Sequence, residues 1–158
     1  MPGPGGAPYV VRTELANYWP AAAFIGTTTA QQDQACLDAT GKMDEYLSGR
    51  YQMPLLAWGS EVKKTCAHIA IYYLMTTRGA SPANGADAAI FARYYDAVGN
   101  PSVPGSLGWL DKVQRQSLHP DITATVPPAQ DPVYGMPQVF TSPRRGWPDS
   151  RNGKPVVG

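Results

Sequence analysis

Apolar residues recur every three or four positions along much of the chain, the spacing that places side chains on one face of a helix. In the first such stretch the apolar positions are Cys36, Ala39, Met43, Tyr46 and Leu47. They predict a long helix over about residues 30–50, capped by the hydroxyl of Thr28 or Thr29. Pro54 lacks an N–H and disfavours a helical conformation in Met53, so the helix should end near Arg50 or Tyr51.

Three further helices are predicted after this turn. Ser60 is the expected cap of the second, whose apolar positions leave little polar surface, so we expect it to be the central helix. The third covers about residues 86–98, and the fourth starts at Ser106 and ends before Pro120. Residues 122–126 alternate between apolar and polar, which predicts one short strand with no partner in the chain.

The helical period stops at Pro127, and prolines stand at positions 127, 128, 132, 137, 143, 148 and 155. The sequence therefore predicts a helical domain over residues 1–126 and an extended C-terminal arm over residues 127–158. The predicted fold class is mainly α, a bundle of about four helices with an extended N-terminal segment and a long proline-rich arm.

The arm carries residue types that dominate the energies of protein interfaces. These residues are Tyr134, Met136, Val139, Phe140, Arg144, Arg145 and Trp147. Ordering so long a segment has a large free-energy cost in backbone entropy. One small domain does not readily offer enough apolar surface to offset that cost by burial, so we expect the arm to fold onto a partner. Phosphate contact is an alternative for the two arginines, although two charges neutralise too little backbone to hold DNA alone.

Composition narrows the function classes. The formal net charge is +1, from 13 basic and 12 acidic residues, which gives no field suited to a dedicated nucleic-acid binder. No stretch approaches the roughly 20 apolar residues that cross a bilayer, and the N-terminus lacks the regions of a signal peptide. We therefore expect that the chain is made in the cytoplasm and does not associate with a membrane.

The titratable residues do not form a catalytic or metal-binding pattern. His68 lies on an apolar helix, where a hydrogen-bonded structural role is expected, and His119 is expected to contact the last carbonyls of the fourth helix. Cys36 and Cys66 fall on apolar stripes, which predicts buried reduced thiols. A disulfide between them requires that the two helices align face to face. No catalytic, cofactor-binding or metal-binding residue is predicted, no cofactor is expected, and the chain is not expected to be an enzyme.

Two tyrosine doublets and one arginine have open roles. In Tyr72 and Tyr73, and in Tyr94 and Tyr95, one ring of each pair can enter the core while the other faces solvent or a neighbouring subunit. Arg50 can pair with Glu45 or Asp44 on its own helix, or with an acidic residue of a neighbour if the segment lies at a subunit boundary. Arg50 and Tyr51 are therefore counted with the arm among the candidate interface residues.

The segment DEYLSGRY, the Pro54–Leu55 turn and the helix that carries Cys66, His68, Ile69 and Tyr73 resemble a family of small proteins encoded in the head-to-tail joining region of Mu-like phages. The closing SPRRGW is a weaker match to the tail of some members. The family is similar in pattern to helical adaptors that form rings under the phage portal. The resemblance covers about the first two thirds of the chain and rests on no catalytic motif.

This resemblance implies a structural virion protein of the neck, present in the host cytoplasm during assembly. Its expected partners are further copies of itself in a ring of twelve, the portal protein and the next neck or tail protein, with DNA passing through the lumen without sequence-specific binding. Two alternatives remain: a monomeric tail-completion or assembly factor that binds one partner transiently, and a small nucleic-acid-binding regulator.

Overall fold

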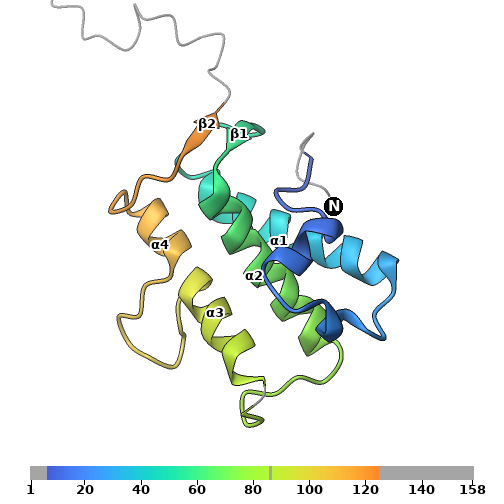
Figure 1. The fold of residues 1–158 in the computed structure, drawn as a ribbon. Coiled ribbons are helices and arrows are strands. Elements are labelled where there is room, and N and C mark those ends of the chain that lie inside the picture. Colours follow the sequence, from blue (N-terminus) through green and yellow to red (C-terminus); the bar gives the residue numbers. More distant parts are fainter. Residues whose placement is uncertain (1–6, 86, 125–158) are drawn as a thin grey trace, which may run out of the picture. The chain divides into compact units, whose positions relative to one another are not determined.

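A computed structural model describes residues 7–85 and 87–124 of the chain (Figure 1). The described part is mainly helical, as the sequence predicts. Two short 3₁₀ helices, η1 (Arg12–Asn17) and η2 (Ala21–Phe24), precede four α-helices. These are α1 (Thr29–Leu47), α2 (Ser60–Thr76), α3 (Ala88–Val98) and α4 (Trp109–Gln114). The strands are β1 (Leu55–Trp58) and β2 (Ile122–Ala124).

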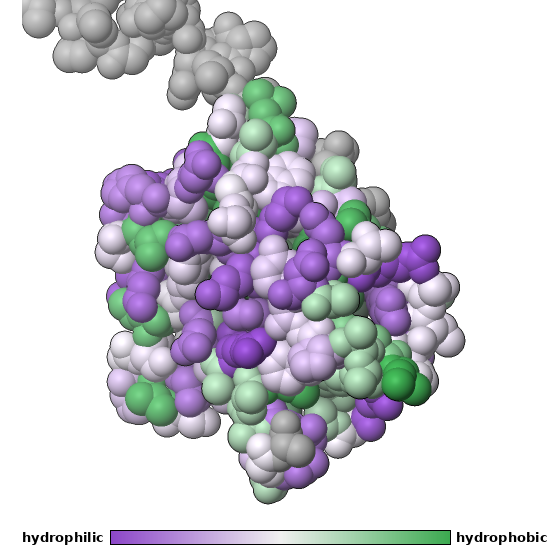
Figure 2. Space-filling view, viewed as in Figure 1, coloured by the Kyte–Doolittle hydropathy of each residue, from purple (hydrophilic) through white to green (hydrophobic). Residues whose placement is uncertain are grey.

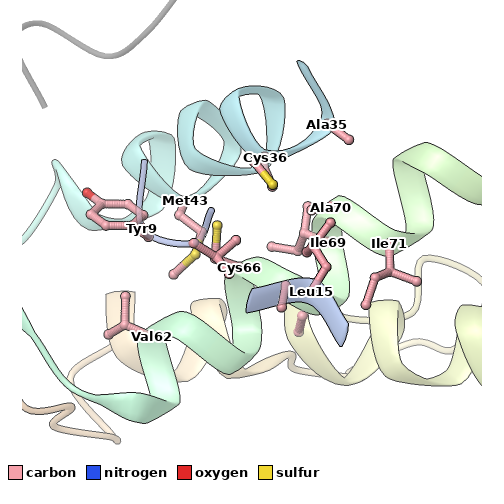
Figure 3. Close-up of a cluster of buried hydrophobic side chains, with 14 of the residues drawn as sticks. Tyr9, Leu15, Ala35, Cys36, Met43, Val62, Cys66, Ile69, Ala70 and Ile71 are labelled. Atoms are coloured by element: carbon pink, nitrogen blue, oxygen red, sulfur yellow. The ribbon is translucent and has the colours of Figure 1, made fainter. Parts of the chain in front are cut away.

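Helix α2 is central and packs between α1 and α3 (Figure 1). Its residues Val62, Cys66 and Ile69 are fully buried because the apolar stripe found in the sequence faces α1. Figure 3 shows Cys36 and Met43 of α1 beside Cys66 and Ile69 of α2. The described segment before α1 closes the same core: Tyr9, Val10 and Leu15 are all buried. The prediction of a central second helix is therefore confirmed.

The two long helices begin differently. Thr28 caps α1 as expected: its Oγ1 accepts from the backbone N–H of Gln31 at 3.2 Å, and Gln31 Oε1 accepts from the Thr28 N–H at 2.9 Å. At α2 the cap is Gly59, so the prediction of a Ser60 cap is wrong. The Gly59 N–H donates to the carbonyl of Asp121, and a Cβ at Gly59 would lie 3.1 Å from Asp121 Cβ. Glycine fits this close approach of two chain segments.

Strand β2 has a partner, which corrects the prediction of an isolated strand. It pairs antiparallel with β1, with Leu55 opposite Ala124 and Trp58 opposite Ile122. The register is irregular between Leu55 and Ala57. The sequence did not reveal β1 because its four residues, Leu-Leu-Ala-Trp, do not alternate between apolar and polar. The body therefore ends in a two-stranded sheet.

Helix α4 is shorter than predicted and begins at Trp109 instead of Ser106. The reason is a close crossing of backbones between the end of α3 and the start of α4. A Cβ at Gly108 would lie 2.2 Å from the backbone nitrogen of Gly99, and Gly99 itself has φ of +92°. Because this crossing holds residue 108 in an extended conformation, the helix starts only at the next residue.

The described residues contain no helix that is both long and apolar enough to span a bilayer. The predicted C-terminal arm and the first six residues lie outside the described part. The division of the chain at residue 126 therefore stays a prediction.

Candidate protein interface

Arg50 lies in the turn after α1 and connects this turn to the last part of α4 and to the segment that follows α4. Its Nη1 donates to the carbonyl of Val113 and to the carbonyl of Leu118, each at 2.7 Å. The guanidinium also lies over the ring of Tyr51, 5.2 Å from the centroid. Arg50 thus donates to one carbonyl in the last turn of α4 and to one in the segment after it. The sequence assigned the contact with the last carbonyls of this helix to His119, which is exposed.

Of the two alternatives left open for Arg50, the pairing with Glu45 or Asp44 is not found, and both carboxylates have other partners. Lys42 Nζ lies 2.8 Å from Glu45 Oε2, and the Tyr9 hydroxyl donates to Asp44 Oδ1. Burial raises the pKa of Asp44, an effect that outweighs the opposite effect of the Tyr9 hydrogen bond. A contact of Arg50 or Tyr51 with a neighbouring subunit stays a prediction, but the Arg50 guanidinium already has partners within its own chain.

The tyrosine doublets form one aromatic cluster on α2 and α3. Tyr72 stacks on Tyr94 with ring centroids 3.7 Å apart and ring planes 12° from parallel. Phe91 meets Tyr72 edge-on at 5.3 Å, and Tyr73 and Tyr95 are tilted against Tyr94. All four tyrosines are partly buried, so the expected split of each doublet into a core ring and an exposed ring does not occur. The rings hold α2 against α3 and leave part of their surface accessible.

Beside this cluster, α3, α4 and the loop between them form an open groove of about 680 Å³, which we call the α3–α4 groove. Its aromatic lining comes from Phe91 and Tyr95 of α3 and from Trp109 of α4. Val103 and Leu107 of the connecting loop add aliphatic surface, and Val103 is 52% exposed. An exposed, concave and largely apolar surface of this kind is suited to binding another protein segment.

A second open hollow, of about 490 Å³, adjoins this groove, since both are lined by Tyr95, Asn100 and Ser106. It extends the accessible surface toward the stacked pair Tyr72 and Tyr94. Other exposed apolar side chains lie singly: Ile25 is 73% exposed and Leu56 of β1 is 65% exposed. Figure 2 shows hydrophobic surface over the β1–β2 sheet and smaller hydrophobic areas among polar ones elsewhere on this face.

His68 lies in a smaller hollow of about 170 Å³ with Lys64, Asp96 and Trp109. Burial, aided by the charges of Arg93 and Lys64, lowers the pKa of His68 to about 4. The imidazole is therefore neutral at pH 7. Within residues 7–85 and 87–124 no side-chain hydrogen bond to His68 is formed, so the hydrogen-bonded role expected from the sequence is not found there.

Both cysteines are free and buried, as predicted. Burial raises the pKa of each thiol to about 12, so neither is a thiolate at neutral pH. The sulfur of Cys66 lies 3.8 Å from the hydroxyl of Thr40, which itself donates to the carbonyl of Cys36. Among the described residues no three His, Cys, Asp or Glu side chains are grouped so that they could hold a metal ion.

The predicted interface residues of the arm lie outside the described residues. They are Tyr134, Met136, Phe140, Arg144, Arg145 and Trp147. Sequence reasoning missed the α3–α4 groove, whose lining comes from two helices and a loop. One signal was present in the sequence: Val103 and Leu107 are apolar residues in a stretch otherwise composed of glycine, proline, serine and asparagine. Apolar residues in such a loop indicate either packing or an exposed contact surface.

Comparison with known proteins gives two similarities. A family model described as bacteriophage Mu, Gp36, matches residues 11–132 of the chain. A protein of Escherichia phage Mu named gene product J is 28% identical over 123 residues, which cover 75% of this chain and 76% of that protein.

Proposed function

The chain belongs to the bacteriophage Mu Gp36 family, and from this membership we propose that it is a structural protein of the virion neck. In this proposal it is a head-to-tail adaptor: copies form a ring beneath the portal, extend the DNA channel and join the capsid to the neck or tail. The observation that carries the proposal is the family match over residues 11–132, which includes all four α-helices and both strands.

The surface of the body supports an assembly role. Closing a ring requires that one patch of each copy meet a different patch of the next. The α3–α4 groove provides one apolar patch, and the exposed Leu56 on β1 lies on a different element. Aromatic residues such as Tyr95 and Trp109, which line the groove, are enriched at the centres of protein interfaces.

The charge of the chain suits a channel through which DNA slides. Residues 127–158 carry four basic and two acidic side chains, so the remaining residues have a net charge of −1 when the whole chain has +1. A near-neutral body makes few phosphate contacts, and binding that depends on such contacts is correspondingly weak. In the proposal DNA passes through the ring without specific binding, and the chain has no enzymatic activity and no cofactor.

The test is a phage whose copy of this gene carries a nonsense mutation. We expect filled heads and separate tails to accumulate, and full-length protein supplied from a plasmid should restore joined particles. A reconstruction of the restored particles should show a ring of this chain between the portal and the tail. A chain required for joining but absent from finished particles would instead establish the alternative, a transient assembly factor. Normal particles without the chain would refute both.

The arm can be tested in the same system. A variant that lacks residues 127–158 should keep the helical circular dichroism of the body but fail to enter particles. Replacing Trp147 with alanine should reduce joining more than replacing Lys154, because buried tryptophans contribute more to interfaces than exposed lysines. Equal effects of the two substitutions would contradict the assignment of Trp147 as an anchor.

A further inference from the structure

The α3–α4 groove combines flat aromatic rings with small and aliphatic side chains. Phe91, Tyr95 and Trp109 supply the rings, and the other apolar lining residues include Pro82, Val103 and Leu107. The groove is open along its length and is not filled by the described part of its own chain. Aromatic-lined grooves of this kind bind proline-rich segments, because such segments already favour an extended helix and lose little entropy when they bind.

The chain itself contains a segment of that chemistry. Residues 137–148, PQVFTSPRRGWP, carry three prolines together with Phe140 and Trp147. Prolines have no N–H to donate, so this segment is poorly suited to add a strand to the open edge of β1. An aromatic groove that needs no ladder of backbone hydrogen bonds is the better match.

We propose that the α3–α4 groove of one copy binds residues 137–148 of a neighbouring copy. The inference rests on the proposed adaptor function and names the partner of the arm as a second molecule of the same chain. Groove and arm are different patches, so the contact is heterologous and can be repeated around a ring. Trp147 and Phe140 occupy the aromatic lining in this arrangement.

Charge orients the bound segment. Asp96 is an exposed acidic residue on the wall of the groove, and Lys112 lies on the α4 side. Arg144 and Arg145 therefore lie toward Asp96 and away from Lys112. The faces of Tyr95 and Trp109 offer an additional favourable contact to a guanidinium group.

The segment is long enough to reach another molecule. The described body ends at Ala124, nineteen residues before Pro143. At about 3.1 Å per residue an extended proline-rich chain of that length spans roughly 60 Å. A domain of about 125 residues has a diameter of roughly 35 Å. A fully extended arm is therefore long enough to reach the groove of an adjacent copy.

The first test measures binding by fluorescence anisotropy. A fluorescein-labelled peptide of residues 127–158 is titrated with full-length protein that carries Phe140→Ala and Trp147→Ala, so that its own arm does not compete. We expect saturable binding, and Ala92→Arg should weaken it by about tenfold or more, because this exposed alanine of α3 lines the groove.

The matched control is Ala89→Arg, because Ala89 is also exposed on the same helix and does not line the groove. It should leave the affinity unchanged within about twofold. A peptide with Trp147→Ala should also bind at least about tenfold more weakly. Absence of saturable binding, or an equal loss from Ala89→Arg and Ala92→Arg, would overturn the proposal.

The second test asks which copy supplies the segment. Val103→Cys is placed in one batch of full-length protein and Ser142→Cys in another, and restored particles containing both are treated with a bismaleimide. Cys36 and Cys66 are buried and should not react. Covalent dimers of the two variants support a contact between copies. Particles that contain both variants but yield no covalent dimer of the two would overturn it.

The two levels of the proposal fail separately. A ring of this chain in the neck with no dimer formed by the bismaleimide would overturn the groove contact and leave the adaptor function in place. Saturable, groove-dependent peptide binding by a chain that is absent from finished particles would overturn the adaptor function and leave the groove contact in place.

Discussion

Replacing Arg50 with alanine should destabilise the isolated chain. Arg50 is partly buried, and its Nη1 donates to the carbonyls of Val113 and Leu118 at 2.7 Å each. Alanine removes both hydrogen bonds; the Val113 carbonyl still accepts from the backbone N–H of Gln116, whereas the Leu118 carbonyl, in the segment after α4, loses the guanidinium donor. It also removes the contact of the guanidinium with the ring of Tyr51.

The expected magnitude follows from these contacts. A hydrogen bond from a charged donor contributes about 1.5–3 kcal/mol net, and partial solvent access places each bond of Arg50 at or below the lower end of that range. The contact with Tyr51 adds about 0.5 kcal/mol. We therefore expect Arg50→Ala to lower the free energy of unfolding by about 2–3 kcal/mol. The stability of Arg50→Lys should lie between that of the unsubstituted chain and that of Arg50→Ala, because the ammonium group of lysine keeps the charge but lacks the planar guanidinium geometry.

The assay is urea unfolding of the full-length chain followed by far-ultraviolet circular dichroism. Arg115→Ala is the control, since Arg115 is exposed just after α4 and should change the free energy of unfolding by less than about 0.5 kcal/mol. If Arg50→Ala were equally neutral in stability but abolished head-to-tail joining, Arg50 would act at a subunit interface and the role derived from its hydrogen bonds would be refuted.

Three further predictions concern the core and its close contacts. Gly108→Ala should destabilise the chain by about 3 kcal/mol or more in urea unfolding, because the added Cβ would lie 2.2 Å from the backbone nitrogen of Gly99. Gly41 has open space around it, so Gly41→Ala should instead stabilise α1 by up to about 1 kcal/mol. Both cysteines should resist Ellman's reagent in the native protein and react fully in concentrated guanidinium chloride; rapid native reaction would contradict their burial. Burial lowers the pKa of His68 from 6.5 to about 4. Between these pH values the imidazole is protonated in the unfolded chain but mostly neutral in the folded chain, so the free energy of unfolding should fall by about 1 kcal/mol as the pH drops from 6.5 to 4. A His68→Asn variant should lose that part of the pH dependence.

The helices could be predicted because each carries a regular apolar stripe. The positions chosen in α1 and α2, such as Met43 and Ile69, are fully buried in the structure. The cap at Thr28 could also be predicted, since a threonine followed three residues later by glutamine satisfies two backbone N–H groups locally. Signals of this kind act between near neighbours in the chain and need no knowledge of the tertiary fold.

Features that depend on distant segments could not be predicted in the same way. The β1–β2 pair joins Leu55 to Ala124, and neither strand has enough residues to reveal its partner by pattern. The Gly59 cap depends on Asp121, and the late start of α4 depends on the crossing of Gly108 over the end of α3. At Gly59 and at Gly108 the structure shows the neighbouring segment that leaves no room for a side chain.

Arg50 connects the fold to the candidate interface. Its acceptors are 63 and 68 residues away along the chain, so local reasoning considered only Glu45 and Asp44. By binding the carbonyls that follow the first turn of α4, Arg50 fixes the position of α4, and α4 contributes Trp109 to the α3–α4 groove. A substitution at Arg50 should therefore weaken groove binding indirectly, by loosening α4, and should lower stability at the same time. Ala92→Arg should weaken the same binding with stability unchanged, and this difference separates support of the groove from contact within it.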